Sequence, residues 1–172
     1  MMMQMLEAGG VRILTDHVRE ADEDNPKGYY EYEAVKQTKQ DPSWVRSAGG
    51  MAVKMVYRLL YDLPPSYQYR VIFMKRPLDE VIASQRVMLQ RTGQQGAALS
   101  DKKLTDVFTR ELTRIDQWLH DQGNMSVLDV SYHDVLEESL KQVEAINRFL
   151  DGSLDTTAMA NAVEPTLHRQ KG

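Results

Sequence analysis

The chain has 172 residues, of which 42% are hydrophobic and 27% charged, and its net charge is −4. This length allows one domain with a proper core, and the acidic balance does not favour general nucleic-acid binding, which needs a clustered basic surface. The chain has no cysteine, which excludes disulfides and thiolate metal sites and fits a cytoplasmic protein; no apolar run approaches the roughly 18 residues of a membrane span.

The first segment, MMMQMLEAGG, predicts a short helix that ends at Gly9 or Gly10. It is a poor signal peptide, because it lacks a basic leader and meets Glu7 early. Four apolar runs then predict short strands, at residues 11–15, 52–56, 69–74 and 126–130. These runs do not alternate with polar residues, and such runs are typical of strands covered on both faces, as in parallel sheets.

Helical patterns lie between and after these strands. Apolar side chains at three- and four-residue spacing predict helices at residues 77–90, about 101–122 and 140–150. Strands that alternate with helices predict a single α/β domain over residues 1–172, with a mostly parallel sheet flanked by helices. Polar loops at residues 16–28, 41–50 and 92–100 are candidate functional segments.

The segment YRVIFMKRPLDEVIASQR carries the clearest candidate site. Its apolar run stops at Arg76, and Pro77 begins a helix that carries Ser84 in its third turn. Open α/β sheets bind ligands at the carboxyl ends of their strands, and a guanidinium can hold a phosphate with two hydrogen bonds. Arg76 and Ser84 are therefore candidate anion-binding residues. The alternative is that Arg76 pairs with a carboxylate and that Ser84 is only a small helix residue.

The stretch KRPLDEVIAS resembles the segment of P-loop sulfotransferases in which an arginine, and a serine eight positions later, bind the 3′-phosphate of the sulfate donor. LDVSYHDVLEE resembles the family's strand ending in Tyr-Glu-Asp-Leu, with His133 where glutamate is usual. AINRFLDGSLD resembles its Phe-Leu-Gly stretch, with Asp151 inserted before Gly152. The start of the chain and the loop sequence NPKGYYE also resemble members of this family, and all these motifs follow in the family's order.

The resemblance implies a P-loop sulfotransferase-like (nucleotide-kinase-like) fold. It implies transfer of a sulfuryl group from 3′-phosphoadenosine 5′-phosphosulfate to a hydroxyl or amine acceptor, which is a small molecule, a glycan or a peptide, without a metal. Arg76 and Ser84 would contact the 3′-phosphate, and Glu31 would be the base that takes the acceptor's proton. The alternative for Glu31 is a solvated surface carboxylate.

The chain departs from the family at its beginning. The family starts with a strand and a Gly-rich loop that holds the 5′-phosphosulfate, and no G-x-x-x-x-G-K-[ST] motif occurs in this chain. The resemblance thus implies an N-terminally truncated domain with weak or absent turnover. Unpaired sheet edges would invite association, so the second hypothesis is a non-catalytic fragment or degenerate relative that binds a partner or forms a homo-oligomer. A nucleotide kinase relative ranks last, because the chain lacks a Walker lysine.

Several other polar residues are also site candidates. Lys54 lies in an apolar run, where a buried lysine needs a partner or a lowered pKa; the alternative is a strand-edge lysine that reaches solvent. The histidines have no metal-ligand spacing, although His133 can line a cleft if it is not simply a polar loop residue. The basic tail residues Arg169 and Lys171 sit at a terminus, where fraying is expected. The histidines are His17, His120, His133 and His168.

Overall fold

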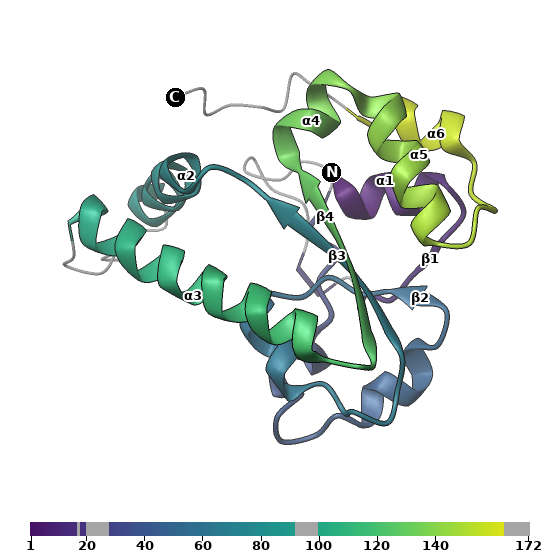
Figure 1. Cartoon of the computed structure of the whole chain (residues 1–172), viewed down its shortest axis with the longest axis horizontal. Coiled ribbons are helices and arrows are strands. Elements are labelled where there is room, and N and C mark those ends of the chain that lie inside the picture. The colour runs from purple at the N-terminus through teal and green to yellow at the C-terminus, as the bar shows by residue number, and fades with distance from the viewer. Residues whose placement is uncertain (17, 20–27, 92–99, 164–172) are drawn as a thin grey trace.

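Strands and helices alternate along the chain, as the sequence predicts for an α/β protein. The computed structural model describes residues 1–16, 18–19, 28–91 and 100–163. The elements are α1 (Met2–Ala8), β1 (Arg12–Ile13), the 3₁₀ helices η1 (Glu33–Gln37) and η2 (Ser43–Ala48), β2 (Met51–Ala52), the 3₁₀ helix η3 (Tyr57–Asp62), β3 (Tyr69–Lys75), α2 (Leu78–Arg91), α3 (Asp101–Asp121), β4 (Met125–Ser131), α4 (Tyr132–Glu137), α5 (Ser139–Phe149) and α6 (Thr156–Asn161) (Figure 1).

The four described strands form two separate parallel pairs. β1 pairs with β2, and β3 pairs with β4. The parallel direction is therefore confirmed, whereas the single sheet expected from the sequence is divided in two. The first two strands are also shorter than the predicted runs at residues 11–15 and 52–56, since each pairs over only two residues.

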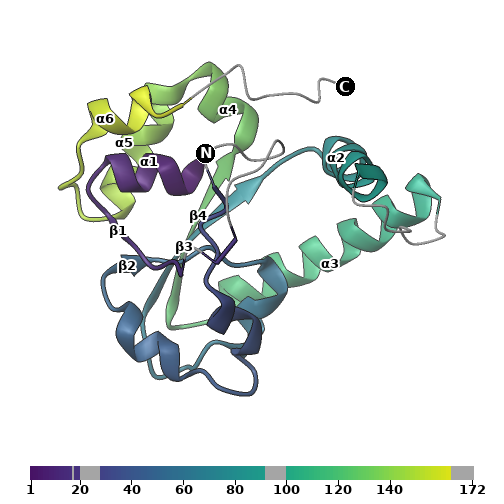
Figure 2. The same ribbon diagram turned by 180° about the vertical axis from the view of Figure 1, so that it is seen from behind.

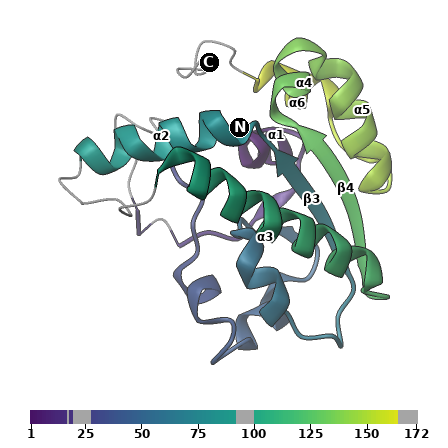
Figure 3. The same cartoon turned by 60° about the vertical axis from the view of Figure 1, so that its left-hand side comes forward.

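The pair β3 and β4 is long and regular. Its register runs from Tyr69 opposite Met125 to Lys75 opposite Ser131, and both strands end at the same edge (Figure 3). Both strands match their predicted runs to within a residue at either end, because an uninterrupted apolar stretch suits a strand covered on both faces.

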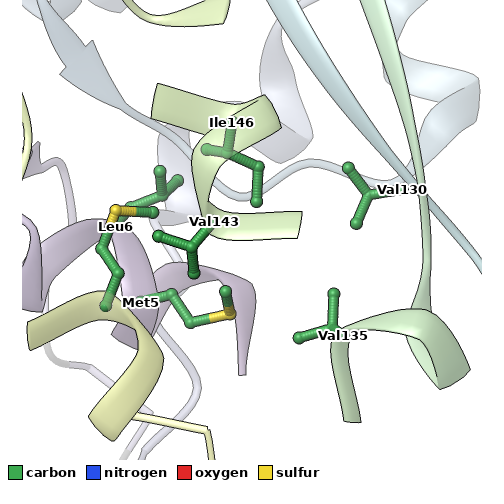
Figure 4. Close-up of a cluster of buried hydrophobic side chains, with 7 residues drawn as sticks. Met5, Leu6, Val130, Val135, Val143 and Ile146 are labelled. Carbon is green, nitrogen blue, oxygen red and sulfur yellow. The ribbon is translucent and has the colours of Figure 1, made fainter. Parts of the chain in front are cut away.

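Two hydrophobic clusters cover the two faces of the strands. The first cluster is centred on α1, α5 and α6 and buries seven residues completely or nearly so: Met5, Leu6, Val130, Val135, Val143, Ile146 and Met159 (Figure 4). α1 packs against α6 in this layer (Figure 2). The second cluster lies among α3 and the three 3₁₀ helices, and its buried members are Val35, Trp44, Val45, Leu60, Leu63, Ile115 and Leu119.

Neighbouring residues on the strands point to opposite clusters. In β3, Ile72 packs against the first cluster and Val71 against the second. The other pair behaves in the same way, with Ala52 in the first cluster and Val53, just after β2, in the second. Both strand pairs therefore separate the same two layers, so they are two parts of one divided sheet layer.

α2 and α3 pack against each other beside the strands (Figure 1). The sequence predicts both helices, with α3 observed one residue shorter at its end than expected. The side chain of Ser100 caps α3 by accepting a hydrogen bond from the backbone of Lys103. An ion pair between Arg86 and Asp101 joins the two helices.

The sequence did not indicate α6 or the 3₁₀ helices. Each has only five or six residues, which is too short to establish a helical period. For α6 a local signal does exist, because Asp155 accepts a hydrogen bond from the backbone of Ala158 at 2.9 Å and caps the helix. At the other end of the chain the predicted helix is confirmed as α1, which ends at Ala8 with Gly9 as its C-cap, and Gly10 makes the following turn with φ of 94°.

Candidate functional site

The two strand pairs begin at one edge of the divided sheet. The backbone carbonyl of Gly9, just before β1, accepts a hydrogen bond from Asp155 at 3.2 Å. Arg70, near the start of β3, donates two hydrogen bonds to Asp151 at 2.5 and 2.7 Å. Both strand starts thus contact the short segment 151–155, and the carboxyl ends of all four strands lie toward the opposite edge. That edge is where open α/β sheets bind ligands.

Arg76 follows the carboxyl end of β3 and is half-buried. Its Nε donates a hydrogen bond to Glu80 Oε2 at 2.8 Å, and its guanidinium lies 4.8 Å from the centre of the Tyr132 ring. Among the residues that the structure describes, none accepts a hydrogen bond from its two Nη groups. Arg76 therefore pairs with a carboxylate, as the alternative interpretation expected, and keeps four N–H donors for another acceptor.

Glu80 joins the ends of β3 and β4. Its carboxylate is 7% exposed, and its Oε1 lies 2.8 Å from His133 Nε2 while Oε2 accepts from Arg76. His133 sits in the first turn of α4, directly after β4. A carboxylate this deeply buried is held by charged or hydrogen-bonding partners, and here the partners come from both strand ends. Sequence reasoning missed Glu80, although its position four residues after Arg76 was a usable signal.

Ser84 lies one helical turn after Glu80 on α2 and is half-buried. Glu80 and Ser84 lie one turn apart on the same face of α2, and Arg76 lies four residues before Glu80, just before the helix begins. No hydrogen bond in the described part of the chain joins Arg76 to Ser84, and the partner of Arg76 there is Glu80. An anion held by both residues would have to sit beside Glu80.

Glu31 lies at the end of the other strand pair. Its backbone carbonyl accepts hydrogen bonds from Thr15 Oγ1 at 2.9 Å and from the Asp16 amide at 3.3 Å. Asp16 Oδ2 in turn accepts from the Glu33 amide at 2.5 Å, and the backbone bonds of this carboxylate hold the pKa of Asp16 below its ordinary value. These bonds fix the segment around Glu31 beside the chain that leaves β1.

Three cations surround the Glu31 side chain. Arg19 lies at 3.1 Å, and the ammonium groups of Lys36 and Lys54 lie at 3.8 and 3.9 Å. The carboxylate is 23% exposed, so it is neither an isolated surface group nor fully buried. The expectation of a solvated carboxylate thus misses this group of cations, which the sequence distributes over 36 positions from Arg19 to Lys54.

Lys54 lies two residues beyond the end of β2 and is held against the loop that carries Glu31. Its Nζ donates a hydrogen bond to the Tyr29 carbonyl at 2.9 Å, and Arg19 stacks over the Tyr29 ring with 3.3 Å to the ring centre. Partial burial lowers the pKa of Lys54, and the nearby Glu31 charge opposes that shift. Hydrogen bonding to Glu33 instead raises the pKa of Lys36.

The predicted site residues form two groups rather than one. Arg76 and Ser84 belong to the β3 and β4 end, and Glu31 belongs to the β1 and β2 end. Within the described ranges, no hydrogen bond or ion pair connects Glu31 to Arg76 or Ser84. A cavity of about 1160 Å³ lies between the two strand pairs; Lys54 lines it, whereas Glu31, Arg76 and Ser84 do not.

Comparison of this chain with protein-family models, with curated proteins and with solved structures gives no match.

The remaining candidates have the following positions. His120 lies on the exposed side of α3, with Nδ1 2.7 Å from the Asp116 carbonyl. His17, His168, Arg169 and Lys171 lie outside the described residues, as does the loop sequence Asn25-Pro26-Lys27. In the part of the chain that is described, no group of three or more His, Asp or Glu side chains is arranged to hold a metal ion, and no helix is long and apolar enough to cross a membrane.

Proposed function

We propose that this protein is of sulfotransferase type and binds 3′-phosphoadenosine 5′-phosphosulfate, with Arg76 and Ser84 at the donor's 3′-phosphate. One observation carries the proposal. A half-buried guanidinium, whose Nη groups have no acceptor among the described residues, follows the carboxyl end of a parallel strand, four residues before a buried carboxylate partner and eight before a serine. A guanidinium keeps its charge and matches a phosphate with two hydrogen bonds. The resemblance of KRPLDEVIAS to the donor-binding segment of P-loop sulfotransferases supports the same assignment.

In the transfer step the acceptor oxygen attacks the sulfur of the donor. A bond forms between the acceptor oxygen and sulfur, and the bond from sulfur to the bridging phosphate oxygen breaks. The 5′-phosphate of the leaving 3′-phosphoadenosine 5′-phosphate keeps the electron pair, and Glu31 takes the acceptor's proton. Such in-line transfers depend mainly on positioning and on cations near the equatorial oxygens, and Lys54 and Arg19 supply cations beside Glu31.

The buried carboxylate of Glu80 sets a condition on phosphate binding. A phosphate on the Nη groups of Arg76 would lie near an acidic group that already uses Nε, and like charges repel. His133 on the other side of Glu80 offsets this repulsion when it is protonated. We therefore expect the affinity for the 3′-phosphate to rise when Glu80 is replaced by Gln, which keeps the shape and removes the charge.

Calorimetric titration separates 3′-phosphate recognition from general nucleotide binding. We expect 3′-phosphoadenosine 5′-phosphate to bind at least tenfold more tightly than adenosine 5′-monophosphate. Arg76→Ala should weaken the bisphosphate by about 10- to 150-fold, the value of a hydrogen bond to a charged group, and Ser84→Ala by about 2- to 10-fold. Neither change should alter binding of the monophosphate.

Arg86→Ala is the matched control, because Arg86 lies on α2, the helix that follows Arg76, but is exposed and paired with Asp101. Equal affinity of the two nucleotides, or equal losses in Arg76→Ala and Arg86→Ala, would remove the 3′-phosphate assignment. Turnover is measured separately with the sulfated donor. We expect this turnover to be weak, because the chain lacks the family's Gly-rich loop motif. Glu31→Gln should lower it further without changing the affinity for the bisphosphate, because Glu31 contacts neither Arg76 nor Ser84.

A further inference from the structure

The break between β2 and β3 is flanked by two strand edges that have no paired neighbour in the described part of the chain. There, each edge strand pairs on one side only, β2 with β1 and β3 with β4. The strand starts share one edge of the molecule, through the contacts of Gly9 and Arg70 with the segment 151–155. Both pairs therefore run in the same direction on either side of the break.

Backbone groups of β3 point into the break. The Tyr69 amide donates to the Asn124 carbonyl at 2.9 Å, and the groups of a parallel strand alternate between its two neighbours. The amides and carbonyls of Arg70, Ile72 and Met74 thus face away from β4. Nothing in the described ranges forms a hydrogen bond with them on that side.

Backbone groups of the chain in and just after β2, on the opposite side of the break, also point into it. The Leu14 amide donates to the Ala52 carbonyl at 2.9 Å, so the backbone groups of Met51 and Val53 face away from β1. Here too the described residues provide no partner. Polar backbone groups that are removed from water are almost always hydrogen-bonded, and two facing rows of them match the two sides of one additional strand.

The cavity in the break has the size of a peptide segment. It measures about 1160 Å³, and two continuous runs of chain, 48–55 and 67–74, form its long walls. Small-molecule pockets usually enclose about 300–1,000 Å³ and are lined by side chains. β3 has seven residues, so a strand of about that length would fill the break along its whole extent.

The residues around the break indicate which side chains a bound strand would carry. The first cluster covers one face of the break through Ala52 and Ile72, and the second covers the other face through Val53 and Val71. A strand between them would be buried on both faces and must be apolar throughout. The charged residues that line the cavity are Arg12, Lys54, Arg70 and Asp151. Asp151 pairs with Arg70 and Lys54 with Glu31. Arg12 is therefore the charged lining residue without an acidic partner in the described part of the chain, and its positive charge favours acidic flanking residues.

We infer that the break binds one extended polypeptide strand of about seven apolar residues with acidic flanks, which runs parallel to β3 and joins the two pairs into one five-stranded sheet. This inference goes beyond the proposed transfer reaction and does not depend on it, since Arg76, Ser84 and Glu31 do not line the cavity. Binding would use main-chain hydrogen bonds for affinity and side-chain burial for selectivity, as in other strand additions.

The test uses the whole chain and three synthetic peptides. The first has seven alternating Val and Ile residues with two Asp residues at each end. The second carries Pro at the central position, which removes one N–H and disfavours a central strand. The third replaces the Asp residues by Lys. We expect the first peptide to bind at least tenfold more tightly than the other two, as measured by fluorescence anisotropy. In Arg12→Glu, the preference for Asp over Lys flanks should fall by at least threefold.

Amide hydrogen exchange identifies the binding mode residue by residue. Binding should slow exchange at Ile72 and Met74 at least tenfold, because their amides gain acceptors. The amides of Val71 and Phe73, which already pair with β4, should change much less. Equal binding of the proline peptide would overturn the inference, as would binding without protection of Ile72 and Met74. A free chain that self-associates with these two amides already protected would also overturn it, because a second copy would then occupy the break.

Discussion

The two strand pairs share a direction and share both covering layers, yet one pairs over seven residues and the other over two. Apolar content does not explain this difference, since the runs at residues 11–15 and 52–56 are as apolar as the segments that form β3 and β4. The contacts at the strand ends do differ. β3 and β4 are joined at their start through Tyr69 and Asn124 and at their finish through Arg76, Glu80 and His133.

The β1 and β2 pair has weaker contacts at its ends. At its start, Arg12 Nη2 donates to the Gly49 carbonyl at 3.4 Å, which is long for a hydrogen bond. At its finish, the Leu14 amide bonds to Ala52. The segment around Glu31 is held beside β1 by hydrogen bonds to the Glu31 carbonyl, but its side-chain ion pairs are with largely exposed cations. The comparison teaches that the length of a parallel pair follows the contacts that close its ends, and three experiments bear on this interpretation.

The largest expected effect comes from the core beneath the longer pair. Ile146 of α5 is fully buried and lies in the same cluster as Val130 of β4 (Figure 4). Ile146→Ala should lower the free energy of unfolding by about 2–5 kcal/mol, through lost burial and the cavity left behind. Ile13→Ala in the partly buried β1 should cost about 1 kcal/mol. Urea denaturation measures both, and equal losses would show that the two pairs contribute alike.

The second largest difference in unfolding free energy is expected between the two carboxylates at the strand ends, Glu80 and Glu31. Glu80→Ala removes a 7% exposed group that Arg76 and His133 both contact, and should cost about 1.5–3 kcal/mol of unfolding free energy. Glu31→Ala removes a carboxylate from a network of largely exposed cations, and should cost less than about 1 kcal/mol. Thermal unfolding at two salt concentrations provides the control, because only the Glu31 effect should shrink markedly in high salt. The reverse ranking would contradict the end-contact interpretation.

The smallest effect is local and concerns the two lysines beside Glu31. Lys54 should titrate below the ordinary lysine value of 10.5 and Lys36 above it, as NMR of ¹³C-methylated lysines can measure. The lowered pKa of Lys54 means that its protonation opposes folding; this penalty is complete below the folded pKa and disappears above the unfolded one. Lys36 acts oppositely, since its contribution is complete below the unfolded pKa and is lost as the pH rises through the raised folded pKa. Identical titration of both lysines would show that the loop around Tyr29 does not cover Lys54.

Much of the fold could be predicted from the sequence because its signals are local. The apolar runs predict β3 and β4 nearly to the residue, and the periodic spacing predicts α2, α3 and α5 with similar accuracy. The break in the sheet could not be predicted this way. Local patterns show that four segments form strands, but the neighbours of each strand are decided by contacts between distant parts of the chain.

The candidate site likewise has one part that local sequence signals predict and another that depends on contacts between distant segments. Arg76 could be predicted as a site residue because the apolar run of β3 stops just before it and Pro77 follows. This prediction needs only neighbouring residues. The burial of Glu80 and its contact with His133, 53 positions later, needs the pairing of β3 with β4. The cations around Glu31 likewise come from separate segments that meet only after folding. Whether these groups bind the proposed donor stays a prediction.

The chain has two tryptophans, and both lie in the second cluster. Trp44 is buried and donates a hydrogen bond to Thr38 at 3.1 Å, while Trp118 packs against Tyr61 with 4.6 Å between ring centres and the rings tilted by 59°. The first cluster contains only aliphatic and methionine side chains. Intrinsic fluorescence therefore reports on a single layer of the molecule. Far-ultraviolet circular dichroism reports on the helices and strands of both layers. Its unfolding curve would coincide with the fluorescence curve only if the first cluster, which has no tryptophan, unfolds together with the second.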